Sequence, residues 1–202
     1  MSRLVRCCVV VGLVMVADSA KAATILFDVN PLTGNPALTT PGRQIVPPVG
    51  SEPFLMFNPA ADVLAFDVAA FAVAISGFAN DVSTSLSPTG VNFIVLQNGA
   101  PLAAGSAADA IANQLTQDGA GFFIYFNSGL NLPRLVYSTN LNDSSADLAV
   151  LGRFTNLSGS LGFAALSTIT AANVQSVPEP STLLLVGTAL VGRRVLRTLR
   201  NR

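Results

Sequence analysis

The densest group of polar side chains that could do chemistry lies between Asn140 and Asp147, where the sequence reads Asn-Leu-Asn-Asp-Ser-Ser-Ala-Asp. Asp and Asn side chains, together with backbone carbonyls, supply the oxygen ligands that Ca²⁺ prefers. Asn140, Asn142, Asp143 and Asp147 therefore form a candidate calcium site. An ordinary hairpin loop is the favoured interpretation, because the segment lacks the central Gly and the closing Glu of an EF-hand loop.

The remaining sequence offers little catalytic chemistry. The chain has no His, and its two cysteines are Cys7 and Cys8, near the start. Ser-His-Asp and Cys-His catalysis are therefore excluded, as are ordinary structural zinc sites. A pair of carboxylates that cleaves polysaccharide would have to use scattered acidic residues such as Glu52, Asp62, Asp67, Asp143 and Asp147. We expect no enzymatic activity and no cofactor.

The charge of the middle of the chain argues against nucleic acid as a partner. Residues 23–177 contain nine acidic residues, three arginines and no lysine, which gives a net charge of −6. An acidic surface repels phosphate backbones, and three scattered arginines release few counterions on binding.

The first 22 residues have the pattern of a secretory signal peptide. Arg3 and Arg6 precede an unbroken apolar run over residues 7–17, and the small residues Ala20 and Ala22 form a signal-peptidase site around Lys21. The apolar run is too short to span a bilayer. The sequence therefore predicts that signal peptidase cuts after Ala22 and that the chain is exported across the inner membrane.

The C-terminal segment combines three parts in a fixed order. The tripeptide Pro178-Glu179-Pro180 is followed by an apolar run over residues 183–191, and the chain ends in a basic stretch. The prolines disfavour helix and strand, which keeps the motif extended. The apolar run can enter a membrane. The basic residues that would then remain in the cytoplasm and fix the orientation include Arg193, Arg194 and Arg197.

Residues 176–202 resemble a PEP-CTERM sorting tail, and Pro178-Glu179-Pro180 matches the recognition motif of that family residue by residue. The resemblance implies a transient membrane anchor, which an exosortase-type transpeptidase cuts near the motif before the domain passes to the cell surface or the medium. An uncleaved C-terminal membrane anchor is the alternative that the charge order also allows.

The body over residues 23–175 shows mostly strand patterns, interrupted by a proline-rich connector. Strands are predicted at residues 24–29, 91–96, 121–126, 134–138 and 147–154. Asn, Ser and Gly between the last three strands predict an antiparallel meander. A helix is predicted over residues 106–117, with Ser106 as its N-cap and Gly119 as its stop. Residues 62–75 and 161–174 mix helical and strand spacing, and both alternatives stay open.

These patterns predict one domain of the mainly β or α+β class, with a single antiparallel sheet and one or two helices. A signal peptide precedes it, and a tail with a short hydrophobic helix follows it.

The expected role is that of an exported cell-surface or extracellular-matrix protein with a structural or interaction function. The alternatives are a polysaccharide-active enzyme and a carbohydrate-binding module that uses aromatic side chains from its strands. The candidate aromatics are Phe122, Phe123, Tyr125 and Tyr137, whose spacing also fits a core. Extracellular polysaccharide would be the partner in both alternatives.

Overall fold

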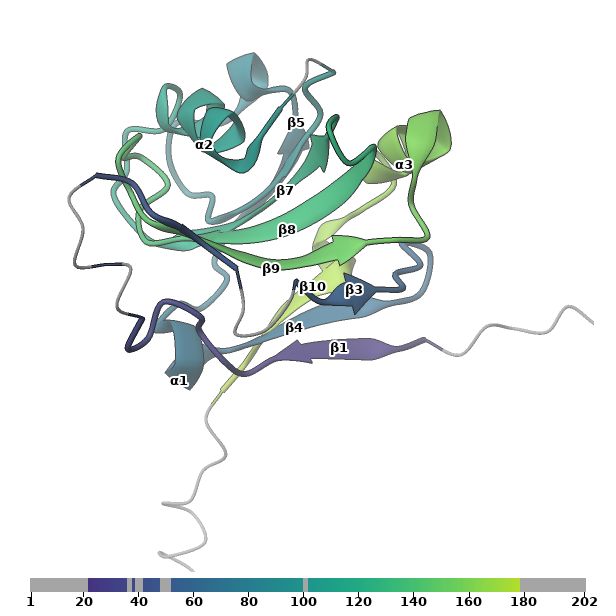
Figure 1. The fold of residues 1–202 in the computed structure, drawn as a ribbon, viewed down its shortest axis with the longest axis horizontal. Coiled ribbons are helices and arrows are strands. Elements are labelled where there is room, and N and C mark those ends of the chain that lie inside the picture. Colours follow the sequence, from purple (N-terminus) through teal and green to yellow (C-terminus); the bar gives the residue numbers. More distant parts are fainter. Residues whose placement is uncertain (1–21, 36–37, 39–41, 48–51, 100–101, 179–202) are drawn as a thin grey trace, which may run out of the picture.

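Two β-sheets face each other, and a helix covers the outer face of the larger sheet (Figure 1). This computed structural model describes residues 22–35, 38, 42–47, 52–99 and 102–178. The sequence predictions for Ala20, for Glu179 and Pro180, and for the arginines of the tail lie outside the described residues.

The smaller sheet has three parallel strands and contains both ends of the described chain. Its strand order is β1 (Thr24–Phe27), β4 (Val63–Asp67) and β10 (Val174–Val177). Central β4 is buried, because Leu64, Ala65 and Phe66 have no exposed surface. The first and last strands of the body therefore flank the same central strand.

The larger sheet mixes parallel and antiparallel pairs. Its strand order is β2 (Ile45–Val46), β9 (Leu148–Phe154), β8 (Leu132–Ser138), β7 (Gly121–Asn127), β6 (Phe93–Leu96) and β5 (Phe78–Asp81), and β3 (Phe54–Leu55) also pairs with β9. The strands β7, β8 and β9 form the predicted antiparallel meander. The other pairs, β5 with β6, β6 with β7, and β2 and β3 with β9, are parallel.

The predicted mainly β class is confirmed, but the sheets differ from the single antiparallel sheet that we expected. The reason is visible between β6 and β7, which are joined through helix α2 (Ala104–Ala112). A helical crossover returns the chain to the same end of the sheet, so the two strands that it connects run parallel.

Three α-helices are present in the described ranges, against the one or two that we expected. These are α1 (Val68–Phe71), α2 and α3 (Gly159–Leu166), accompanied by the 3₁₀ turns η2 (Ser83–Ser85) and η3 (Ala171–Asn173). Both segments left open by the sequence contain two kinds of structure. Residues 62–75 form β4 and then α1, while residues 161–174 contain most of α3, then η3 and the start of β10.

The prediction that Ser106 caps the helix is wrong. Helix α2 begins at Ala104, so Ser106 lies in its first turn and Ala103 occupies the cap position. Ser106 Oγ instead accepts a hydrogen bond from the backbone N of Ala103 at 2.9 Å. A serine three residues into a helix can satisfy the same free N–H groups from inside the first turn.

The core between the two sheets is aromatic. The ring centroids of Phe66 on β4 and Phe122 on β7 lie 4.1 Å apart, and Phe71 and Tyr137 extend the cluster. On the outer face of the large sheet, α2 packs Ala107 and Ile111 into a second apolar cluster. These two clusters fix the layer order as small sheet, large sheet and helix α2.

All four aromatics considered for carbohydrate binding lie in these clusters. Phe122, Phe123 and Tyr125 have no exposed surface and Tyr137 is 5% exposed. The core interpretation is therefore correct for them, and a sugar cannot reach their rings.

Candidate functional sites

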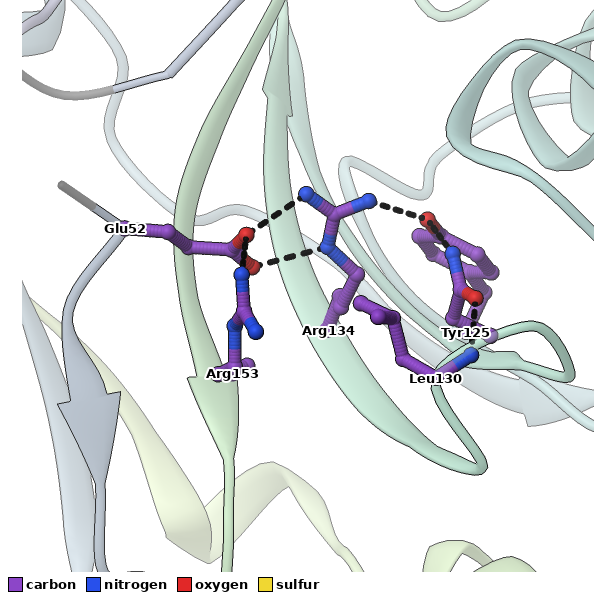
Figure 2. A network of polar contacts seen from close by, with 6 residues as sticks. Glu52, Tyr125, Leu130, Arg134 and Arg153 are labelled. Carbon is purple, nitrogen blue, oxygen red and sulfur yellow. Dashed lines mark hydrogen bonds and ion pairs between the residues drawn. The ribbon is translucent and has the colours of Figure 1, made fainter.

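A buried ion-pair cluster joins Glu52 to two arginines on neighbouring strands (Figure 2). Arg134 on β8 donates from Nε and Nη2 to the two carboxylate oxygens of Glu52, each at 2.7 Å. Arg153 on β9 donates from Nη2 to Glu52 Oε2, also at 2.7 Å. The Glu52 side chain is 6% exposed, so this carboxylate is held almost entirely by the two guanidinium groups.

Burial and charge act in opposite directions on Glu52. Burial by itself raises the pKa of the carboxyl, but the hydrogen bonds and positive charges of Arg134 and Arg153 outweigh it and hold the pKa below its ordinary value. For Arg134, burial lowers the pKa, and the contacts with Glu52 and Tyr125 more than restore it. Both groups therefore stay ionised at neutral pH.

The contacts continue from Arg134 along the same face of the sheet. Arg134 Nη1 lies 3.3 Å from the hydroxyl of Tyr125, and Asn127 Nδ2 donates to the same hydroxyl at 3.0 Å. Asn127 Oδ1 then accepts from the backbone N of Leu130 at 2.9 Å. The network thus extends from the segment before β3 to the turn between β7 and β8.

The position of Glu52 depends on the close approach of β3 to β9. Phe54 is the register partner of Arg153, whose guanidinium lies 5.3 Å from the centroid of the Phe54 ring. A Cβ on Gly152 would come within 2.7 Å of Leu55 Cδ1 and 3.2 Å of the Pro53 carbonyl oxygen. Only glycine at position 152 lets β3 lie this close.

This arrangement suits strand packing better than catalysis. All three hydrogen bonds to Glu52 come from guanidinium groups that are themselves mostly covered, 17% and 26% exposed for Arg134 and Arg153. A carboxylate engaged in this way is a poor general base. Sequence reasoning missed the cluster. Residues 23–177 contain one glutamate, Glu52, and three arginines, and Arg134 and Arg153 are two of those three.

A groove of about 340 Å³ lies between β1 and the segment around β3. Its apolar lining residues are Ile25, Leu26, Phe27, Val29, Pro31, Pro53, Leu55 and Leu151. Leu26 and Val29 are 52% and 70% exposed. Among the described strands, β1 pairs only with β4. The other edge of β1 therefore has no strand partner there, and residues of β1 line the groove.

A second hollow, of about 440 Å³, lies where the end of α3 meets β5. Asn80 on its wall donates from Nδ2 to the carbonyl oxygens of Leu166 and Ile169 at 2.8 and 2.7 Å. These bonds tie β5 to the segment that follows α3. The amide nitrogen of Asn80 is therefore engaged in contacts within the protein.

The side chains of the candidate calcium residues form hydrogen bonds with other groups of the protein. Asn140 Oδ1 accepts from the backbone N of Gly119, and Asn140 and Asn142 both donate to Asp118 Oδ1 at 3.2 Å. Asp143 and Asp147 point to different partners: Asp143 Oδ1 accepts from Ser145, and Asp147 Oδ1 accepts from the backbone N of Gln44. Across the described ranges, no three His, Cys, Asp or Glu side chains lie together in a way that could hold a metal. The calcium site stays a candidate, and these contacts favour the hairpin-loop interpretation.

The other candidate carboxylates also have structural partners. Asp67 Oδ1 accepts from the backbone N of Ala69 at 2.7 Å and caps α1. Asp62 is 7% exposed and accepts from the backbone N groups of Ala23 and Asn58, each at 2.8 Å. Asp62, Asp67 and Glu52 are thus each held by different partners.

The ends of the described chain lie beside the predicted processing sites. Ala22, the last residue of the predicted signal peptide, is exposed. At the other end, β10 runs through Val177, and Pro178 of the predicted sorting motif follows it directly. Strand β10 therefore extends across the predicted boundary between body and tail at residues 175 and 176.

The fold and its contacts define a two-sheet β protein in which the buried charges hold strands together. The family model for the PEP-CTERM protein-sorting motif matches residues 176–201, so the chain carries this sorting motif. No curated protein and no solved structure matches the chain. The motif indicates an exported protein that is held in the membrane by its C-terminal tail and then processed by an exosortase. In the described parts of the chain, no helix has both the length and the apolar character needed to cross a membrane.

Proposed function

We propose that the exported body is a structural or interaction module of the cell surface or extracellular matrix, without catalytic activity. The observation that carries this proposal is the exposed apolar edge next to β1. Leu26 and Val29, which line the 340 Å³ groove, are 52% and 70% exposed. Monomeric proteins rarely gather large apolar side chains on one region of the surface unless that region makes a contact.

The free edge of β1 supports an interaction role in a second way. An edge strand presents N–H and C=O groups that can pair with another extended segment. Lysine, proline or a bulge commonly protects such an edge, but β1 reads Thr-Ile-Leu-Phe. This edge could therefore accept an apolar strand from another matrix component.

The contacts of the acidic residues support the non-catalytic part of the proposal. A glycosidase needs two carboxyl groups that face one substrate site, one of them with a raised pKa. Glu52 has a lowered pKa and is held by Arg134 and Arg153, while Asp62 and Asp67 are engaged by backbone N–H groups.

The first experiment determines the intact mass of the protein from cell, matrix and medium fractions of its native host. We expect a chain that starts at Ala23, ends near Pro178, Glu179 or Pro180, and stays with the surface or matrix fraction. A product that retains the basic end through Arg202 would instead be a C-terminally anchored membrane protein.

A pair of variants then tests the apolar edge. Leu26→Glu places a charge at the groove, whereas Leu161→Glu places one on α3, at a leucine that is 83% exposed against 52% for Leu26. We expect Leu26→Glu to move to the medium while Leu161→Glu stays in the matrix fraction. Equal retention of both variants contradicts a contact through β1.

Carbohydrate binding remains the alternative function, and one residue favours a test of it. All fourteen aromatic residues lie in the described ranges, and Phe54, at 71%, is the only one that is mostly exposed. A sugar-binding module would be retarded on a column of host polysaccharide, and Phe54→Ala would abolish the retardation. Release of reducing ends from the same polysaccharide would indicate an enzyme.

A further inference from the structure

The amino terminus expected for the processed chain lies against a buried carboxylate. The backbone N of Ala23 donates to Asp62 Oδ1 at 2.8 Å, and Asp62 is 7% exposed. We propose that signal-peptide removal creates an ion pair between the α-amino group of Ala23 and Asp62, which stabilises the exported fold relative to the uncleaved precursor. This inference rests on the proposed export and on cleavage after Ala22.

The chemistry of the cut changes the charge of one atom that is already in place. Hydrolysis of the peptide bond between Ala22 and Ala23 consumes one water. It leaves a carboxylate on Ala22 and an amine on Ala23. An α-amino group has an ordinary pKa of about 8, so it is mostly protonated at neutral pH. The Ala23 nitrogen thereby changes from a neutral amide donor into a cation.

The nitrogen does not have to move for the pair to form. The Ala23 carbonyl accepts from the backbone N of Val63 at 2.9 Å, and Thr24 is the register partner of Val63. The β1–β4 pairing therefore holds Ala23 next to Asp62 independently of the carboxylate contact. Ala22, on the other side of the cut bond, is exposed.

Among the described residues, Asp62 has no cationic partner. Its Oδ2 accepts from the backbone N of Asn58 at 2.8 Å, and its carbonyl accepts from Asn173 Nδ2 at 2.9 Å. Both donors are neutral, and the ion pairs among the described residues do not include Asp62. A carboxylate removed from water without a counter-charge destabilises the fold, and a new ammonium at 2.8 Å offsets this cost.

The other charged residues on the surrounding elements lie at the far end of the sheet. Asp28 follows β1 and Asp67 ends β4, both beyond the register pair of Phe27 with Phe66. The loop over residues 58–61, η3 and β10 contain no charged residue. On these elements, Asp62 is thus the charged group positioned to meet the new α-amino group.

The pair would link stability to export. A precursor with an unpaired buried carboxylate folds less stably, and a chain that folds less stably is easier to thread through a translocation channel. The cut occurs on the far side of the membrane, where the same chain then gains its full stability. The device needs no residue beyond Ala23 and Asp62.

The sequence permits a selective test. Lys21 is the only lysine of the chain, so a product that begins at Ala23 has the α-amino group as its sole primary amine. The full chain is exported from a host that has signal peptidase, and intact mass establishes the first residue. Acetylation of the purified product then removes this single positive charge and leaves an N–H donor, as in the precursor.

We expect acetylation to lower the Tm by about 2–4 °C. Asp62→Asn should remove the difference between the free and acetylated forms, since its side chain carries no charge. The control Asp28→Asn removes an exposed carboxylate beyond the far end of β1 and should preserve the difference. If Asp62→Asn does not fold, the Tm difference between the free and acetylated wild-type proteins still tests the inference.

The rate of acetylation gives a second readout that does not depend on unfolding. Pairing with Asp62 raises the pKa of the α-amino group, and each unit of pKa lowers the reactive fraction at pH 7 about tenfold. A mass that shows another first residue overturns both the cleavage site and the inference. A start at Ala23 with equal Tm values and an unslowed reaction overturns the inference alone and leaves the export proposal standing.

Discussion

The guanidinium of Arg134 and the carboxylate of Glu52 meet side by side, with Nε and Nη2 of Arg134 each 2.7 Å from a different carboxylate oxygen. Two parallel charge-assisted hydrogen bonds fix the relative orientation of two planar groups as well as their distance. Arg153 adds a third bond from the neighbouring strand. The contact therefore holds the short strand β3 and the two residues before it against β8 and β9.

Removal of the carboxylate should destabilise the protein strongly. Glu52→Gln leaves the largely buried guanidinium groups of Arg134 and Arg153 without a counter-charge, and we expect a loss of about 2–4 kcal/mol in the free energy of unfolding. Urea titration measures this loss.

An ion pair whose carboxylate is half-exposed provides the control. Asp109 pairs with Arg43 at 2.9 Å, but the Asp109 side chain is 50% exposed. Asp109→Asn should cost less than Glu52→Gln, about 1 kcal/mol, because water reaches the carboxylate of this pair although Arg43 is only 14% exposed. Similar losses for both variants would show that burial of the Glu52 cluster adds nothing to its contribution.

The same cluster predicts a loss of stability in acid. The pKa of Glu52 is lowered in the folded protein from the ordinary value of 4.5, because Arg134 and Arg153 outweigh the effect of burial. The stabilisation is then complete above pH 4.5 and is lost as pH falls through the lower folded value. Unfolding measured between pH 3 and pH 7 should show a shallower pH dependence for Glu52→Gln than for the wild-type protein.

Asp143 supplies the control for this pH dependence. Hydrogen bonds from the backbone and side chain of Ser145 lower its pKa as well, but Asp143 is exposed to solvent. Asp143→Asn should leave the acid limb of the curve close to that of the wild-type protein. A wild-type slope in Glu52→Gln would assign acid unfolding to other carboxylates.

Tyr137 predicts a loss of stability at alkaline pH. Burial raises its pKa above the ordinary value of 10.0, and its hydroxyl donates to the Phe71 carbonyl at 3.2 Å. The folded state therefore keeps the proton where the unfolded chain has lost it, so stability falls as pH rises above 10. Tyr137→Phe should reduce the slope of stability against pH in this range.

Gly152 tests the close approach of β3. Gly152→Ala forces its Cβ within 2.7 Å of Leu55 Cδ1, and we expect a loss of about 1–3 kcal/mol. Gly99→Ala is the control, because a Cβ there would meet Phe163 Cζ at an ordinary 3.9 Å. Equal stability of the two variants would show that β3 moves without cost.

The sequence predicted the elements whose signals are local. The meander of β7, β8 and β9 could be predicted because strand-forming residues alternate with Asn, Ser and Gly turns, and no distant partner is needed to recognise them. The strands β2 and β3 have two residues each and lie in or next to the proline-rich connector, so they carry no periodic pattern. Parallel pairing of such segments depends on tertiary packing, which composition does not reveal.

The Glu52 cluster was beyond sequence reasoning for a similar reason. Its carboxylate lies 82 and 101 residues away from the two arginines that bind it. Charged residues within otherwise apolar strands, as Arg134 and Arg153 are, indicate a buried partner but do not identify it. The contact between Ala23 and Asp62 joins residues 39 apart and was missed in the same way.

The position of β10 leads to a prediction about processing. Val177 is still paired with Asp67 on β4, and Pro178 of the sorting motif follows immediately. Ser176 is also fixed, because its Oγ accepts from the backbone N of Ile75. An enzyme that reads the motif as an extended chain must therefore work within one or two residues of a folded sheet.

A spacer should relieve this crowding. We expect insertion of Gly-Gly-Ser between Val177 and Pro178 to raise the rate of C-terminal processing several-fold, without a change in Tm. The measurement is a pulse-chase in the native host, with precursor and product separated by mass. The control inserts the same three residues between Ser128 and Gly129, in the turn between β7 and β8, far along the chain from the motif. An unchanged rate in the spacer variant would mean that the enzyme cuts before β10 pairs with β4. The motif would then not lie next to a folded sheet, and a spacer would bring no advantage.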